Sequence, residues 1–193
     1  MNRIDCLKLI LETFPNNPII FTTGYTCREA HAIQDRENNF YMVGSMGLAS
    51  SIAAGLAYCV KESVVIVDGD GSVLMNPSGL FLSKILGIDN LIHIVLDNST
   101  YDSTGGQITH SDKFDLCKMA LLAGYKIVES ASKADDFQLS LQYFLENKGP
   151  HFLRVHIVSG GTSQAPRISV PLPQLTNRFK EFVAGNLHGS WIV

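Results

Sequence analysis

An apolar strand runs directly into a glycine-rich turn at Val64-Val65-Ile66-Val67-Asp68-Gly69-Asp70-Gly71-Ser72. A second apolar run, Leu91-Ile92-His93-Ile94-Val95-Leu96, ends in Asp97-Asn98, with 25 residues between Gly71 and Asp97. Near-continuous apolar runs of this kind are typical of buried parallel strands. Because ligands of open α/β sheets bind outside the carboxyl ends of the strands, we expect the two polar ends to share one functional edge.

Strand-like runs alternate with helix-like runs along the chain, which predicts an α/β fold: a doubly wound parallel sheet with helices on both faces. We expect a single domain over residues 1–193, with a loop at 159–173 and a tail at 185–193. Pro77 suits a first helical position, with Asn76 as its N-cap. The expected strands cover residues 18–23, 64–68, 91–98, 124–129 and 151–158, and the expected helices cover 4–14, 48–60, 77–86, 113–123, 134–146 and 175–184.

The composition is that of an ordinary globular domain, with 46% hydrophobic and 17% charged residues and a net charge of −3. This balance, without any basic run, disfavours nucleic acid and anionic membranes as partners. The N-terminus does not resemble a signal peptide, and the apolar run at 48–60 is shorter than the roughly 20 residues of a membrane span. Cys6, Cys27, Cys59 and Cys117 form no CxxC pair, which favours reduced thiols and a cytoplasmic location.

The two strand ends supply oxygen ligands for a divalent cation that carries a diphosphate. Asp70 would bind Mg²⁺ through its carboxylate, Asn98 through its side-chain oxygen and Thr100 through its backbone carbonyl. The diphosphate would add further oxygens, which suits the octahedral coordination that Mg²⁺ prefers. These residues therefore predict a magnesium site, although Asp68 and Asp70 would also fit a plain turn that caps a strand.

Glycines on both sides of Asp70 fit the same hypothesis. Gly69 and Gly71 would let the backbone turn sharply and approach a phosphate closely. The N–H groups of Gly71 and Ser72 would then bind diphosphate oxygens, as at other loop or helix-start anion sites.

The GDG element, followed after 25 residues by an Asn-containing pair, resembles the thiamine diphosphate-binding motif. This chain has Asp97 where many members carry the first of two asparagines, while the metal-binding second position is intact at Asn98. Upstream, Gly44-Ser45-Met46-Gly47 resembles the segment that holds the aminopyrimidine ring of the cofactor. The resemblance implies that the Gly44 carbonyl and the Met46 N–H bind the pyrimidine and that the Met46 side chain forces the cofactor into a bent V shape. A plain core position for Met46 is the alternative.

Longer segments narrow the resemblance further. They look most like the phosphonopyruvate decarboxylases, with the sulfopyruvate decarboxylase β subunits a close second. The resemblance extends from Ile4 to about Ala184 and implies a carboxy-lyase that uses thiamine diphosphate and Mg²⁺ to convert 3-phosphonopyruvate to phosphonoacetaldehyde and CO₂. The segments are Thr23-Gly24-Tyr25-Thr26-Cys27-Arg28-Glu29, Phe40-Tyr41-Met42-Val43-Gly44-Ser45-Met46-Gly47 and Asp97-Asn98-Ser99-Thr100-Tyr101-Asp102-Ser103-Thr104-Gly105-Gly106-Gln107.

The resemblance also implies a partner chain. In single-chain members of this family, a further domain precedes this region and supplies the glutamate that activates the cofactor. No glutamate of this chain matches that position, so we expect an α subunit that carries the missing domain, with the cofactor held between the chains of an α2β2 or larger assembly. The alternative is a non-catalytic subunit that binds the cofactor but cannot activate it.

The substrate's phosphonate or sulfonate needs its own site, and the hydroxyls and glycine N–H groups after Asn98 concentrate donors there. Ser103 is the foremost candidate, and His110 is a candidate proton donor or acceptor. Arg28 would either bind an anion or pair with Glu29 or Asp35. Asp102 is expected to orient a turn or a hydroxyl. Candidates for contact with the cofactor, beyond those above, are Thr23, Gly24, Tyr25, Thr26, Tyr101 and Asp102.

Overall fold

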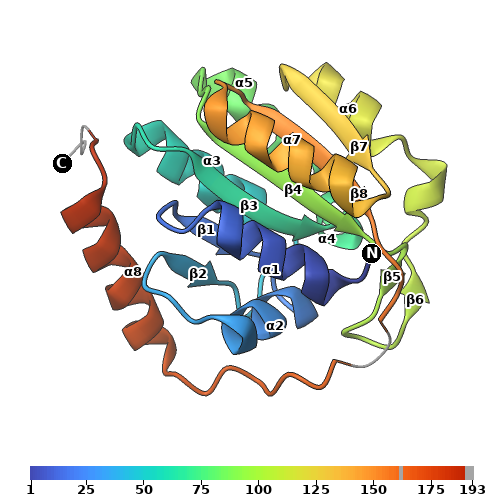
Figure 1. The fold of residues 1–193 in the computed structure, drawn as a ribbon, viewed down its shortest axis with the longest axis horizontal. Coiled ribbons are helices and arrows are strands. Elements are labelled where there is room, and N and C mark those ends of the chain that lie inside the picture. The colour runs from blue at the N-terminus through green and yellow to red at the C-terminus, as the bar shows by residue number, and fades with distance from the viewer. Residues whose placement is uncertain (161–162, 190–193) are drawn as a thin grey trace.

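In the computed structural model, which describes residues 1–160 and 163–189, the chain forms a six-stranded sheet (Figure 1). The strands lie in the order β2-β1-β3-β4-β8-β7, and every neighbouring pair is parallel. The predicted doubly wound α/β fold is therefore confirmed. The strands are β1 (Ile19–Phe21), β2 (Asn39–Tyr41), β3 (Val64–Gly69), β4 (Leu91–Asp97), β7 (Ile127–Ala131) and β8 (His151–His156), and a separate hairpin pairs β5 (Thr100–Tyr101) with β6 (Gln107–Ile108).

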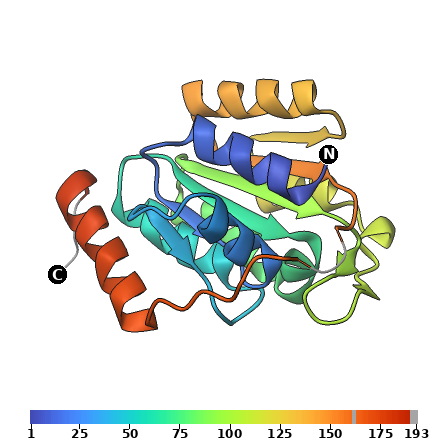
Figure 2. The same ribbon diagram turned by 60° about the horizontal axis from the view of Figure 1, so that its bottom comes forward.

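Helices cover both faces of the sheet, because successive strand side chains point to opposite faces and build two cores. In β4, Ile92 and Ile94 join the core beneath α1, α2 and α7, whereas Leu91 and Val95 join the core beneath α3 and α6. Figures 1 and 2 show α1 and α7 side by side on the first face. The helices are α1 (Arg3–Thr13), α2 (Tyr25–Ile33), α3 (Ala49–Cys59), α4 (Asp70–Met75), α5 (Leu82–Leu86), α6 (Leu116–Ala123), α7 (Ala134–Glu146) and α8 (Leu172–Asn186), with 3₁₀ turns η1 (Pro77–Phe81) and η2 (Ser111–Lys113).

The chain changes direction across the sheet between β1 and β3. After β1 it pairs β2 on one side, and then returns to pair β3 on the other side. This reversal leaves a crevice outside the carboxyl ends of β1 and β3, which is where open α/β sheets bind ligands.

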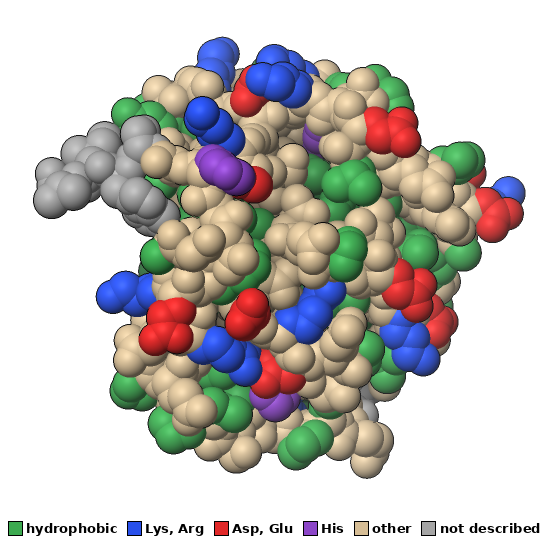
Figure 3. Space-filling model, turned by 60° about the vertical axis from the view of Figure 1, so that its left-hand side comes forward, with side chains coloured by type: hydrophobic (Ala, Val, Ile, Leu, Met, Phe, Trp, Pro, Cys, Tyr) green, Lys and Arg blue, Asp and Glu red, His purple; other side chains and the backbone are tan. Residues whose placement is uncertain are grey.

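The last helix covers the β2 edge of the sheet. Residues 163–171, which we call the strap, run past α2 before α8 begins (Figure 1). Phe179 of α8 packs on Phe40 of β2 with ring centroids 5.2 Å apart, and Arg178 pairs with Asp35 at 2.7 Å. Figure 3 shows this side of the molecule, where acidic, basic and apolar side chains are intermixed. The edge strand β2 is thus shielded by packing and charge.

Several element boundaries differ from the sequence-based expectation. No element was expected between Gly24 and the helix at 48–60, yet α2 and β2 lie there. β2 was not predicted because its three residues form too short an apolar run to be recognised. The GDG turn is the start of a helix, with Gly69 as the N-cap of α4. Asn76 does not cap the next helix through its side chain, which instead donates to the Gly47 carbonyl at 2.9 Å.

Further element boundaries, in the C-terminal part of the chain, also differ from the expectation. The helix expected at 113–123 begins at Leu116, because the Asp115 side chain caps it by accepting from the Lys118 N–H at 3.0 Å. The strand expected at 124–129 is β7, and the helix expected at 77–86 is η1 followed by α5. α8 is longer than expected at both ends, so it takes residues from the predicted loop at 159–173 and tail at 185–193. Residues 161–162 and 190–193 of these two segments lie outside the described residues.

In the part of the chain that the structure describes, no helix combines the length and apolar character needed to cross a membrane.

One buried histidine makes the stability of the fold depend on pH. His151 in β8 is 1% exposed, and its ring stacks on Phe144 with centroids 4.4 Å apart. Burial, helped by the charge of Lys126, lowers the pKa of His151 from 6.5 to about 4. Between these values the unfolded chain binds more protons than the folded chain. The stability that neutral His151 contributes is therefore present above about pH 6.5 and is lost as the pH falls toward 4.

We predict that His151→Phe flattens this dependence. Urea unfolding from neutral pH down to about pH 5 should show a loss of unfolding free energy that is smaller than in the wild type by about 2 kcal/mol. The matched control is His156→Phe, which changes an exposed histidine of the same strand and should keep the wild-type slope. Equal slopes in all three proteins would contradict the assignment to His151.

Candidate functional site

A cleft opens at the crevice between β1 and β3, outside the carboxyl ends of β1, β3 and β4. The fold gathers its lining from segments that are far apart in sequence, including Arg3 of α1 and Leu96 of β4. We call it the cofactor cleft, after the residues predicted to serve there. The predicted site residues that line it are Thr23, Tyr25, Thr26, Met46, Gly69, Asp70, Gly71, Ser72, Asn98, Thr100, Tyr101, Asp102 and Ser103.

The remaining predicted residues lie elsewhere. Gly24 lines a second cleft that also contains Met46 and Ser103. Gly44 and Ser45 line neither cleft, but they lead into Met46. His110 is exposed, precedes η2 and does not occur among the described residues that line either cleft. The predicted proton-transfer role of His110 therefore has no support in this arrangement.

Two strained backbone positions flank the cofactor cleft. Ser45 has a φ of +56° and Ser99 has a φ of +59°, in the left-handed region that non-glycine residues seldom adopt. Ser45 immediately precedes Met46, and Ser99 separates Asn98 from Thr100. Strain of this kind persists where the surroundings fix the backbone and is concentrated at functional sites.

The segment that carries Met46 is anchored on α4. The Ser72 hydroxyl accepts a hydrogen bond from the Gly47 N–H at 3.0 Å and lies 3.1 Å from the Thr22 hydroxyl. On the other side of the same glycine, the Asn76 amide donates to the Gly47 carbonyl. These contacts fix the position of Met46 relative to the GDG element, even though the two are far apart in sequence.

Gly71 serves a contact that the sequence did not indicate. A Cβ atom at this position would lie 2.2 Å from the ring of Tyr101, so only glycine allows the ring to pack there. The Tyr101 hydroxyl donates to the Gly71 carbonyl at 3.4 Å. A phosphate that approaches the backbone at Gly71, as predicted, would have to share this space with the Tyr101 ring or displace it.

Asp70 is a buried carboxylate, 2% exposed, whose Oδ2 accepts a hydrogen bond from the Thr109 hydroxyl. Burial raises the pKa of Asp70 to about 6; the Thr109 hydrogen bond opposes this rise and the nearby charge of Asp97 adds to it. The ionised form is therefore poorly compensated by the protein alone. A cation bound beside Asp70 would stabilise that form.

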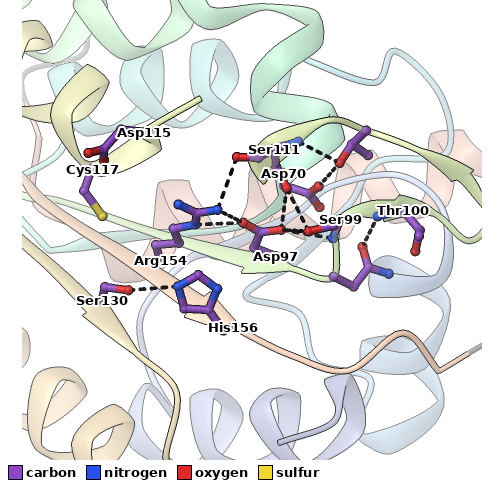
Figure 4. Close-up of polar contacts among 12 residues, drawn as sticks. Asp70, Asp97, Ser99, Thr100, Ser111, Asp115, Cys117, Ser130, Arg154 and His156 are labelled. Carbon is purple, nitrogen blue, oxygen red and sulfur yellow. Dashed lines mark hydrogen bonds and ion pairs between the residues drawn. The ribbon is translucent and has the colours of Figure 1, made fainter. Parts of the chain in front are cut away.

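Asp97, the neighbouring buried carboxylate, is fully compensated (Figure 4). Its Oδ2 lies 2.7 Å from Nε and 2.6 Å from Nη2 of Arg154, which comes from the adjacent strand β8. Its Oδ1 accepts from the Ser99 N–H at 3.0 Å and from the Ser111 hydroxyl at 2.9 Å. Both arginine nitrogens donate to the same carboxylate oxygen, and charge-assisted hydrogen bonds of this kind are stronger than those between neutral groups. Asp97 therefore ties β4 to β8 and holds Ser99 in its strained conformation.

A hydrogen-bonded chain connects the two carboxylates. The Ser111 hydroxyl reaches Asp97, the Ser111 N–H donates to the Thr109 hydroxyl at 3.3 Å, and that hydroxyl donates to Asp70. Arg154 is thus linked through Asp97, Ser111 and Thr109 to Asp70, the predicted metal ligand, and helps to orient it.

Asp102 organises the other side of the cleft. Its carboxylate accepts from the Asn98 amide at 2.8 Å, from the Thr100 hydroxyl at 2.7 Å and from the Ser159 hydroxyl at 2.8 Å, and it pairs with Arg3 at 3.3 Å. Burial alone would raise the pKa of Asp102. The hydrogen bonds from Thr100 and Ser159, together with the charge of Arg3, lower this pKa below its usual value. The contacts agree with the expectation that Asp102 orients hydroxyls and its own turn.

No pattern in the sequence pointed to Arg3. It lies in α1, and its guanidinium joins Asp102 to Glu29 of α2, with Nε 2.7 Å from a Glu29 carboxylate oxygen. The partner of Arg3 is set by the packing of α1 on α2, which local sequence patterns do not reveal. Glu29 is thereby paired, and so it does not pair with Arg28.

The donor set can be compared with what a metal ion requires. Among the described residues, no three His, Cys, Asp or Glu side chains cluster as a metal site would need. A cation in the cofactor cleft would therefore rely on the Asp70 carboxylate, the Asn98 amide oxygen and the Thr100 carbonyl. One carboxylate with neutral oxygens suits a hard divalent ion that brings phosphate oxygens with it, so the residues present fit Mg²⁺ bound to a diphosphate.

Comparisons with known proteins agree with this chemistry. Residues 22–155 match the family model described as thiamine pyrophosphate enzyme, C-terminal TPP binding domain. The chain is 38% identical over 175 residues to the phosphonopyruvate decarboxylase of Streptomyces hygroscopicus, which covers 91% of this chain but 44% of that protein. It is 37% identical over 185 residues to the sulfopyruvate decarboxylase subunit beta of Methanothermobacter thermautotrophicus, covering 96% of this chain and 97% of that subunit.

Solved structures support the fold. The benzoylformate decarboxylase of Polynucleobacter necessarius superposes with a TM-score of 0.68 at 17% identity, covering 80% of this chain and 33% of that one. The chain therefore spans about a third of that enzyme, and less than half of the phosphonopyruvate decarboxylases it matches.

We predict that the Asp97–Arg154 pair is strongly coupled. Arg154→Met should lower the free energy of unfolding by about 3 kcal/mol, because it leaves Asp97 buried without a counter-ion. The double variant Asp97→Asn with Arg154→Met should recover most of this loss in urea unfolding, since neither of the two positions then carries a buried charge. Arg178→Met is the matched control: its ion pair with Asp35 is about one-third exposed and should contribute less than about 1 kcal/mol. A double variant no more stable than Arg154→Met would contradict this coupling.

Proposed function

The chain belongs to the thiamine pyrophosphate enzymes, through their C-terminal cofactor-binding domain, and from this membership we propose that it is the cofactor-binding subunit of a two-subunit 2-oxoacid decarboxylase. The cofactor, also called thiamine diphosphate, would bind with Mg²⁺ in the cofactor cleft. The preferred substrate is 3-phosphonopyruvate, which loses CO₂ to give phosphonoacetaldehyde. The observation that carries the proposal is the convergence of Met46, Asp70 and Asn98 on one cleft at the carboxyl edge of the sheet.

Each group of lining residues has a distinct task in this proposal. Asp70, Asn98 and the Thr100 carbonyl hold Mg²⁺, and the N–H groups of Gly71 and Ser72 bind the diphosphate. When bound, thiamine diphosphate supplies an electron sink for the negative charge left by departing CO₂. The residues proposed to bind the far diphosphate oxygens and to complete the cofactor site are Thr23, Gly24, Tyr25, Thr26, Gly44, Ser45, Gly69, Tyr101 and Asp102.

Met46 is proposed to set the cofactor's shape. It lies between the cofactor cleft and the second cleft, and it lines both. A flexible, polarizable thioether can fill the irregular gap between two rings. The anchoring of Gly47 on Ser72 and Asn76 keeps this side chain at a fixed place beside the proposed diphosphate site.

A partner chain is proposed to supply the carboxyl group that activates the cofactor. All glutamates of this chain lie among the described residues, and none of them lines the cofactor cleft. Glu29 contacts Arg3, which lines the cleft, but the Glu29 carboxylate is paired with that guanidinium. The near full-length match to a protein named as a beta subunit supports an α subunit, and we propose an α2β2 or larger assembly with the cofactor shared between chains.

Sulfopyruvate is the second candidate substrate, because the match to the sulfopyruvate decarboxylase subunit covers nearly all of both chains. Both substrates are small 2-oxo acids with a tetrahedral anionic head. A cytoplasmic location is also proposed: Cys6, Cys27, Cys59 and Cys117 are all free thiols in the structure, as in a reducing compartment.

The decisive experiment measures decarboxylation of phosphonopyruvate and sulfopyruvate with thiamine diphosphate and Mg²⁺. The full chain is assayed alone and after co-expression with a chain that carries the missing domain. We expect turnover only in the mixture, with the faster substrate identifying the enzyme. Turnover by this chain alone would refute the need for a partner carboxyl group, and no turnover of either substrate in the mixture would favour a non-catalytic binding subunit.

We predict that Asp70→Asn weakens cofactor binding without lowering the stability of the chain in the absence of ligand. The dissociation constant for thiamine diphosphate with Mg²⁺ should rise at least about tenfold, because the only carboxylate ligand is lost. The same variant should unfold at an equal or higher temperature without ligand, since burial disfavours the ionised carboxylate. Calorimetric titration and thermal unfolding measure the two effects, with Asp89→Asn, at a carboxylate whose side chain is 44% exposed, as control. A destabilised variant with unchanged cofactor affinity would refute the metal-ligand role.

A further inference from the structure

A second cleft, with a volume of about 440 Å³, adjoins the cofactor cleft. It shares Thr23, Met46 and Ser103 with that cleft, so a small molecule bound beside Met46 would reach both. We call it the basic cleft because two arginines, Arg28 and Arg167, line it. Its remaining lining residues are Gly24, Val43, Thr104 and Ile168.

Neither arginine of the basic cleft has an acidic partner in the described part of the chain. Arg28 pairs with neither Glu29 nor Asp35, the two partners considered from sequence, because Glu29 holds Arg3 and Asp35 holds Arg178. Arg167 forms no ion pair or hydrogen bond with the other described residues. Two arginines without a described acidic partner therefore line one cleft of a chain whose net charge is −3. Such a local field concentrates anions.

Arg28 also positions Arg167. Its Nε donates to the Pro166 carbonyl at 3.3 Å and its Nη2 donates to the Ala165 carbonyl, so Arg28 holds the strap just before Arg167. The guanidinium of Arg28 lies over the Tyr25 ring, 5.2 Å from its centroid. These contacts leave Nη1 of Arg28 without a described hydrogen bond, so that part of the guanidinium remains available to a ligand.

Neutral groups complete the cleft. The Ser103 hydroxyl has no hydrogen-bond partner among the described residues, and it lies against Gly24, where a Cβ atom would come within 2.9 Å of it. Val43, 53% exposed, and Ile168 add apolar surface. An anion with a short carbon chain matches this combination: hydroxyl and guanidinium donors for its head, and apolar contacts for its methylene group.

Resting on the proposed function, we propose that the basic cleft binds the tetrahedral anionic head of the substrate, with Arg167 and Arg28 as the residues that select a phosphonate or sulfonate over an uncharged methyl group. The planar guanidinium fork matches tetrahedral oxyanions better than an ammonium group does. The 2-oxo acid end of the substrate then lies toward Met46 and the cofactor cleft. Ser103 donates its free hydroxyl to the same head.

The diphosphate of the cofactor carries the same chemistry and is the competing ligand for these arginines. The two ligands make different demands, however. If the arginines bind the substrate head, their loss changes substrate affinity and leaves cofactor affinity intact. If they bind the diphosphate, their loss weakens the cofactor first.

The test uses Arg167→Ala, because this exposed side chain can be removed without breaking a described contact. We expect KM for phosphonopyruvate in the assembled enzyme to rise about tenfold or more, as for the loss of a charge-assisted hydrogen bond, with a smaller change in kcat. Turnover of pyruvate, which lacks the head group, should stay within about twofold. Arg167→Lys should recover part of the loss. Lys148→Ala removes an equal charge at the opposite end of β8 and should behave as the wild type.

A binding measurement separates this inference from the proposed function. Calorimetry with phosphonoacetate, which carries the head group but no 2-oxo group, is done on the full chain and does not depend on turnover. Binding that weakens in Arg167→Ala would support the basic cleft even if no decarboxylation were found. No binding by the wild type, equal binding by Arg167→Ala, or a parallel loss of thiamine diphosphate affinity would overturn it.

Discussion

Parallel pairing of β3 with β4 brings two buried carboxylates to the same end of the sheet, and the rest of the site is arranged around that constraint. Asp70 follows β3 and Asp97 ends β4, and each is almost entirely removed from water. Two like charges in a poorly solvated environment cannot both stay ionised without compensation. Among the described residues, Arg154 forms an ion pair with Asp97, whereas Asp70 accepts a hydrogen bond from the Thr109 hydroxyl and has no cationic partner. The imbalance leaves one carboxylate for a cation while the other holds the sheet together.

The predicted metal ligand Asn98 is held in place by residues from distant parts of the chain. Arg3 in the first helix and Ser159 after the last strand both contact Asp102, which in turn holds the amide of Asn98. The predicted metal ligand is thus fixed by residues from both ends of the chain. Such supporting contacts determine how well a ligand set is oriented before the ion arrives. They also explain why Asp102, a carboxylate beside a proposed anion site, is not free to repel the anion: its charge is shared among four donors.

The features predicted from sequence were those encoded in short, continuous stretches. The apolar runs of β3 and β4 and the polar residues that end them predicted the central strands and their shared edge, whereas Thr23, Tyr25, Thr26 and Met46 were predicted from the resemblance to the thiamine diphosphate enzymes. The β2 strand was missed because three residues at a sheet edge carry too little pattern. Arg3, Arg154 and Arg167 were missed for a different reason: their positions in the fold are set by helix packing, by the order of strands and by the path of the strap. His110 follows the glycine-rich loop in sequence but does not line either cleft, and its role in proton transfer stays a prediction.

The strap has a consequence for how such proteins diversify. The residues that face the cofactor sit at strand ends, where a substitution disturbs the packed layers. The strap contributes no strand or helix, and only Ile168 and Val170 of it pack against a core. Insertions, deletions and exchanges between residues 163 and 171 are therefore tolerated far better than changes in the GDG element. With the basic cleft in its proposed role, changes in this one exposed connection would alter the choice of substrate while the sheet and the GDG element stay as they are.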